Sequence, residues 1–121
     1  MRFAVDRSRW RCGDLSERSH GIGETKLLNE HGYRCCLGFV GHQLGCPDDK
    51  MEAHGEPAQC NYFRKVIGRR TEDGWINTRL TDAAMEINDS EELSRADREV
   101  ALKALFKKHG HEIVFRGKYT D

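Results

Sequence analysis

The sequence contains no long apolar run. Only 37% of its 121 residues are hydrophobic, and no span approaches the roughly 20 consecutive apolar residues that a membrane helix needs. The opening segment, Met1–Asp6, also lacks the apolar stretch of a secretory signal. We therefore expect a cytoplasmic protein that makes no contact with a membrane.

The chain also lacks net charge. It has 20 basic and 20 acidic residues, which removes the overall attraction to nucleic acid that a basic protein would have. The charges are unevenly spread, because residues 1–70 carry 12 basic and 9 acidic side chains, and residues 71–121 carry 8 and 11. A local anion site in the first half stays open, whereas a protein that coats DNA is not expected.

The usual spacings of metal and redox sites are missing. The sequence has no Cys-x-x-Cys and no His-Glu-x-x-His, so no metal site and no cofactor are predicted. A small zinc-stabilised accessory protein is kept as an alternative, since five cysteines and six histidines are present. The cysteines, which we expect to be reduced thiols, are Cys12, Cys35, Cys36, Cys46 and Cys60.

A catalytic cysteine has one argument in its favour. Cys35 and Cys36 open a predicted helix, whose dipole would stabilise a thiolate. Burial as small hydrophobic side chains is the simpler interpretation. No catalytic residue is therefore predicted, and whether the protein is an enzyme is left open.

Hydrophobic periodicity predicts three helices. Cys36, Val40 and Leu44 share one face of a helix over residues 35–44, which Gly45 would cap. A second helix is predicted over residues 78–87, with Leu80 at the start of its apolar face. A third is predicted over 95–108, preceded by a capping sequence that starts at Ser94. A further one or two helical turns are predicted within 48–54.

Strands are predicted at both ends of the chain and in a hairpin. Apolar and polar residues alternate over 2–7 and over 111–116, and a hairpin is predicted near 26–35 with Gly32 in its turn. Because the helices are grouped, the predicted class is α+β. The expected architecture is one domain over 1–121, with a small antiparallel sheet of three or four strands covered by helices on one face.

Two segments combine arginine with aromatic residues. Arg7-Ser8-Arg9-Trp10-Arg11 sets a tryptophan among alternating arginines, a composition that suits a phosphate or a base. The alternative interpretation is that Trp10 anchors the N-terminal segment to the core. Residues 60–70 repeat the mixture of aromatic and basic side chains. The predicted ligand-binding set is Arg9, Trp10, Arg11, Arg34, Tyr62, Arg64 and Asn88.

The segment Tyr33-Arg34-Cys35-Cys36-Leu37-Gly38-Phe39 resembles the "CCLG" signature of a group of small proteins encoded by bacteriophages and prophages. Further matches to that pattern are Arg9-Trp10, Leu27-Leu28 and Ile87-Asn88-Asp89. The resemblance implies a phage origin and a place of action in the cytosol of an infected bacterium. It carries over no catalytic residue, because the members are mostly uncharacterised.

Together, the resemblance and the arginine-rich segments predict a phage-encoded binding protein. Its expected function is to counteract host defence by sequestering a nucleotide signal. Its partner would be a small anionic or nucleotide ligand. An alternative is an anti-CRISPR-like inhibitor that covers the surface of a host defence protein, using the acidic stretch over residues 72–99 to imitate phosphates. Self-association is a further open expectation, since a terminal strand at the edge of the sheet could pair with a second copy.

Overall fold

The structure is a computed structural model of the chain. It describes residues 1–10, 27–28, 32–52, 70–71, 74–75, 79–90 and 92–119. The helices within this part are α2 (Cys36–Gln43), α3 (Asp48–Glu52), α5 (Arg79–Asp89) and α6 (Arg95–Lys108). The strands are β1 (Arg2–Asp6), β2 (Arg70–Thr71), β3 (Gly74–Trp75) and β4 (Glu112–Arg116). The chain is thus a mixed helix and strand structure, as the periodicity predicts.

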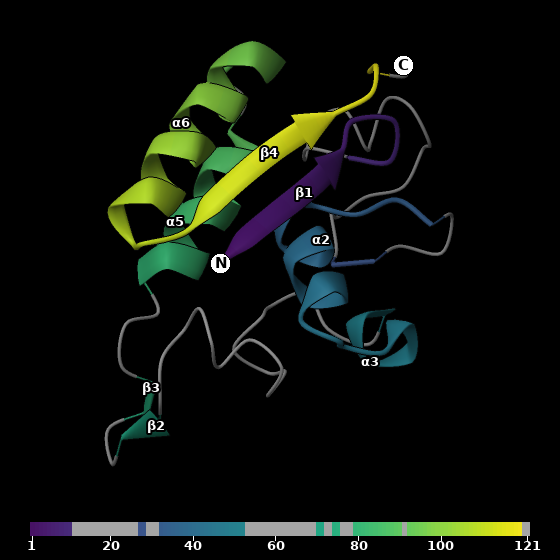
Figure 1. Cartoon of the computed structure of the whole chain (residues 1–121), viewed down its shortest axis with the longest axis vertical. Coiled ribbons are helices and arrows are strands. Elements are labelled where there is room, and N and C mark those ends of the chain that lie inside the picture. The colour runs from purple at the N-terminus through teal and green to yellow at the C-terminus, as the bar shows by residue number, and fades with distance from the viewer. Residues whose placement is uncertain are drawn as a thin grey trace.

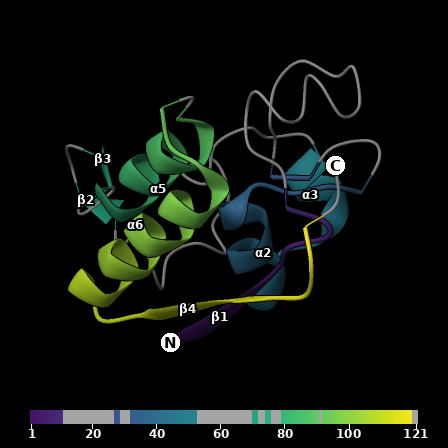
Figure 2. The same cartoon turned by 90° about the horizontal axis from the view of Figure 1, so that it is seen from above.

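The first and last strands pair with each other in parallel, as Figure 1 shows. Phe3 lies opposite Ile113, and Val5 lies opposite Phe115. These four side chains are buried, while their neighbours along each strand are more exposed. In Figure 2 the helices α2, α5 and α6 all lie on one side of this pair, so the alternation of side chains buries one face of the ribbon against the helices.

The prediction of an antiparallel sheet of three or four strands is wrong. In the part of the chain that the structure describes, β1 and β4 form a two-stranded parallel sheet, and β2 and β3 form a separate antiparallel pair of two residues each. Alternation predicts that a segment is a half-buried strand, but it does not specify the partner strand. Parallel pairing needs a long crossover, and the helices between β1 and β4 provide it.

The predicted hairpin near 26–35 is not formed by its described residues, 27–28 and 32–35. Leu27 and Leu28 are both buried, which removes the alternation that a half-buried strand requires. Arg34 forms an isolated parallel bridge with Trp10 instead, and its N–H donates to the Arg9 carbonyl at 2.9 Å. Gly32 does adopt a positive φ, of 83°.

The predicted helices are confirmed: α6 has the predicted bounds, and the ends of α2 and α5 differ from the prediction by one or two residues. Ser94 caps α6 by accepting a hydrogen bond from the Asp97 N–H at 3.1 Å, the arrangement that its sequence predicts. Gly45 follows α2 with φ of 93°. The short helix predicted within 48–54 is present as α3.

The outer edge of β1 is covered by a side chain of α2. The Ala4 N–H donates to Gln43 Oε1 at 2.9 Å, and Gln43 Nε2 donates to the Ala4 carbonyl at 2.6 Å. One amide side chain therefore makes the pair of bonds that a neighbouring strand would make. No helix among the described residues has the length and apolar character to span a membrane.

Candidate functional site

Four of the seven predicted ligand-binding residues lie in the described part of the chain. They are Arg9, Trp10, Arg34 and Asn88, and the structure brings them together at the end of β1 and the start of α2. Arg11, Tyr62 and Arg64 lie outside the described residues, so the predicted convergence of residues 7–11 with residues 62–70 stays a prediction.

Trp10 and Asn88 form a buried polar contact. The indole N–H of Trp10 donates to Asn88 Oδ1 at 2.6 Å, and the backbone N–H of Cys36 donates to the same oxygen at 3.0 Å. Both side chains are nearly inaccessible to solvent, with relative exposures of 3% and 0%. This contact joins the chain after β1 to the start of α2 and the end of α5. Trp10 therefore anchors the N-terminal segment to the core, which is the alternative interpretation given above.

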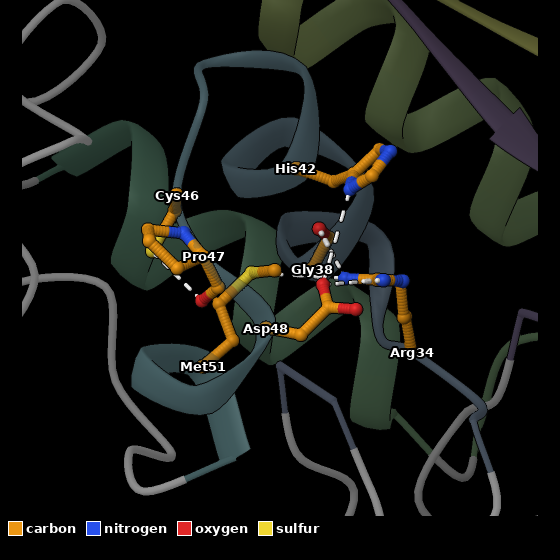
Figure 3. Close-up of polar contacts among 7 residues, drawn as sticks. All are labelled: Arg34, Gly38, His42, Cys46, Pro47, Asp48 and Met51. Atoms are coloured by element: carbon orange, nitrogen blue, oxygen red, sulfur yellow. Dashed lines mark hydrogen bonds and ion pairs between the residues drawn. The ribbon is translucent and has the colours of Figure 1, made fainter.

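Arg34 is engaged at the corner between α2 and α3, as Figure 3 shows. Its Nη2 lies 3.1 Å from Asp48 Oδ1, and its Nη1 donates to the Gly38 carbonyl at 3.4 Å. His42 Nδ1 lies 4.0 Å from the same Asp48 oxygen. The guanidinium therefore holds α3 against the first turn of α2.

Arg9 is the described member of the predicted set that keeps its side chain at the surface. Its guanidinium lies over the half-buried ring of Tyr33, 5.5 Å from the centroid. This cation–π contact keeps the charge in water while it covers the ring.

The cysteines within the described residues are interior side chains. Cys35, Cys36 and Cys46 are reduced thiols with at most 7% exposure. The Cys36 thiol lies 3.8 Å from the Ala84 carbonyl, to which it donates. No group of three or more potential metal ligands occurs among the residues that the structure describes. All three side chains belong to the hydrophobic core of the described residues.

A groove that the sequence did not indicate lies between α6 and the segment that follows β4. It is a shallow depression, largely open to solvent, with a volume of about 570 Å³. We call it the Tyr119 groove. Its walls are formed on one side by Ala96, Val100 and Lys103, and on the other by Gly117, Lys118 and Tyr119.

Arg7 and Glu99 also line the Tyr119 groove. Arg7 donates from Nε to Glu99 Oε2 at 2.9 Å and from Nη2 to Glu99 Oε1 at 2.7 Å, a two-pronged ion pair. Its Nη1 donates to the Gly117 carbonyl at 3.1 Å, and the Tyr119 hydroxyl donates to Glu99. The hydrogen bonds to Glu99 raise the pKa of Arg7 further above its usual value.

Cations surround the tyrosine ring. The guanidinium of Arg95 lies 4.9 Å from its centroid, and that of Arg7 lies 5.6 Å from it. Lys103 Nζ lies 5.9 Å from the ring centroid of Phe115. Val100 adds an apolar surface that is 67% exposed. The groove therefore combines positive charge with aromatic and aliphatic surface.

The groove combines basic and aromatic side chains, as the predicted ligand site does, but most of its residues are different ones. Arg7 belongs to the arginine-rich segment singled out above, whereas Glu99, Lys103 and Tyr119 come from the second half of the chain. One signal was available: Arg95, Glu99 and Lys103 follow each other at four-residue spacing and so share a helix face. Nothing in the sequence connects that face with Arg7.

Comparisons of the chain with models of protein families, with curated proteins and with solved structures gave no match. The assignment of the candidate site therefore rests on the geometry described above.

Proposed function

We propose that the chain is a binding protein for a small anionic ligand with a planar group, a nucleotide being the class that suits it best, and that the Tyr119 groove holds this ligand. The observation that carries the proposal is the lining: three cations, Arg7, Lys103 and Lys118, stand against one carboxylate, Glu99. Cationic side chains suit phosphates, and the exposed side chain of Val100 offers apolar surface for a base.

The biological setting follows from the "CCLG" resemblance. In this proposal the protein is made by a phage and lowers the concentration of a nucleotide signal used in host defence. Binding without turnover would serve that purpose, because an abundant small protein removes a signal by mass action. The Trp10–Asn88 contact supports the fold in this proposal, and the ligand lies elsewhere.

Thermal unfolding in the presence of a nucleotide panel tests the proposal. A ligand at one hundred times its dissociation constant stabilises the folded state by about 2.7 kcal/mol, which raises the melting temperature of a domain of this size by several degrees. We expect such an upshift with at least one mono-, di- or cyclic nucleotide, and a smaller one as salt is added.

Reversing the charge of one lysine inside the groove and of one outside it gives a matched pair of variants. Lys103→Glu should weaken binding of the responding nucleotide about tenfold or more, since it replaces an attraction to phosphate by a repulsion. Lys108→Glu makes the same change in the last turn of α6, outside the groove lining, and should retain binding. Isothermal titration of both variants measures the difference.

Two results would contradict the proposal. One is the absence of any upshift across the panel at millimolar ligand. The other is an equal loss of affinity in both lysine variants, which would place the ligand away from the groove. The first result would leave the protein-surface inhibitor and the zinc-stabilised accessory protein as the remaining expectations, and the second would keep a nucleotide ligand but move its site.

A further inference from the structure

Glu99 occupies a place in the Tyr119 groove where several donors converge on one carboxylate. Two parallel N–H groups of Arg7 point at its carboxylate, at 2.9 and 2.7 Å, and the Tyr119 hydroxyl donates to the same group. A guanidinium edge with an added hydroxyl donor is an arrangement that recognises a phosphate or carboxylate. Here the carboxylate in that arrangement belongs to the protein itself, as the side chain of Glu99.

We propose that Glu99 is the built-in occupant of an anion subsite, and that a phosphoryl group of the ligand takes its place on Arg7 and Tyr119. This deepens the proposed function and rests on it. Arg7 would then be a ligand-binding residue, and Glu99 would set the affinity by competing with the ligand.

The position of Glu99 makes the exchange feasible. Its side chain is 10% exposed and lines the groove, so a displaced carboxylate has an exit into the groove. Arg95 and Lys103 are four residues away in either direction on α6, where side chains on one helix face meet. A carboxylate that leaves Arg7 therefore keeps cationic neighbours, and the charge is not left isolated.

The contacts of Arg7 also suggest why the subsite stays formed during the exchange. Its Nη1 donates to the Gly117 carbonyl at 3.1 Å, a bond that does not involve Glu99. The backbone N–H of Arg7 donates to the Arg116 carbonyl at 2.9 Å, as a continuation of the β1–β4 pairing. The guanidinium is thus held from the strand side, and only its partner on α6 needs to change.

Titration of inorganic pyrophosphate into the wild-type protein and Glu99→Gln at fixed ionic strength tests the inference. Glu99→Gln should bind pyrophosphate about tenfold more tightly or better, because the ligand no longer competes with a charge-assisted ion pair. Glu86→Gln removes one negative charge from an exposed position on α5 and should retain wild-type affinity. Equal affinity of Glu99→Gln and wild type would overturn the inference.

A second variant tests whether the gain in affinity comes from a vacated subsite on Arg7 or only from the loss of a negative charge. Arg7→Lys in the Glu99→Gln background keeps the positive charge but loses the two-pronged donor. We expect it to abolish most of the gain in affinity. A gain that persists in the double variant would assign the effect to long-range electrostatics and overturn the inference.

A measurement on the wild-type protein covers the case in which Glu99→Gln does not fold. Nitrogen-15 NMR of arginine side chains should show the Arg7 Nε–H signal moving at saturating pyrophosphate. A signal that stays fixed while the protein binds pyrophosphate would overturn the subsite and leave the proposed function intact. No binding of pyrophosphate or nucleotides to wild type or variant would remove both.

Discussion

Asn88 connects three segments through one side-chain oxygen. Its Oδ1 accepts from the Trp10 indole N–H and from the Cys36 backbone N–H, and its Nδ2 donates to Asp89 Oδ1 at 2.9 Å. Leaving a buried donor without its acceptor costs more than an average hydrogen bond contributes. An asparagine at 0% exposure is therefore a structural requirement of this fold.

Replacement of this amide should be costly. Asn88→Ala removes the acceptor of two buried donors, at about 1–3 kcal/mol each, so we expect a loss of about 2–6 kcal/mol in the free energy of unfolding. Urea titration measures the loss, and tryptophan fluorescence should shift to the red as water reaches Trp10.

Glu86→Ala, at an exposed position on the same helix, is the control and should stay within about 0.5 kcal/mol of wild type. If the two alanine variants were equally stable, the Trp10–Asn88 contact would not be holding these segments together.

At the scale of the element, α2 depends on the absence of a side chain at Gly38. A Cβ built at this position would lie 1.9 Å from the Leu27 carbonyl oxygen and 2.8 Å from the Arg34 Cβ. Glycine weakens a helix by about 1 kcal/mol relative to alanine, so this residue lowers local propensity. The close approach of the Leu27 backbone explains why the sequence keeps it.

Gly38→Ala should destabilise the protein although alanine favours helix. The clash is with backbone, which cannot rotate away, and we expect a net loss of about 2–4 kcal/mol by thermal or urea unfolding. The gain of about 1 kcal/mol in helix propensity is too small to offset it.

Gly110→Ala is the comparison for this prediction. That glycine has φ of 81°, and no heavy atom of the described residues lies within 4 Å of the position that a Cβ would take. Its replacement should therefore cost only the backbone strain, about 1–2 kcal/mol. A Gly38→Ala variant as stable as wild type would show that the Leu27 segment can move away from α2.

At the scale of the whole molecule, β1 and β4 fasten the two ends of the described chain to each other. The ladder extends beyond the strands, since the Glu112 N–H donates to the Met1 carbonyl at 2.8 Å. The Met1 ammonium lies 3.1 Å from His111 Nδ1. Burial lowers the pKa of His111, and the positive charges of that ammonium and of His109 lower it further.

This shift predicts that acid weakens the fold. The unfolded chain takes up a proton at His111 near the ordinary histidine pKa of about 6.5, whereas the folded protein resists protonation. Folding stability should therefore be unaffected by His111 above that pH and fall as the pH decreases below it. Urea midpoints between pH 8 and pH 5 measure the trend, and His111→Gln should make it shallower. Parallel profiles for the two proteins would contradict the prediction.

The helices could be predicted because their signals are local. The apolar spacing in α2, α5 and α6 and the cap at Ser94 involve residues within a few positions of each other. The sheet could not be predicted in the same way, since Phe3 and Ile113 lie at opposite ends of the chain and alternation names no partner. The candidate site was predicted in composition only, because no local pattern joins Arg7 to Glu99 and Tyr119.

The sequence by itself determined where the longer helices and the terminal strands lie, through periodicities that each segment carries alone. Only the tertiary structure decided that β1 and β4 pair in parallel, that Trp10 and Asn88 support the core, and that Arg7, Glu99 and Tyr119 line a common groove. These contacts depend on how helices and strands pack over the whole chain, and side chains that are distant in sequence become neighbours only once that packing is complete.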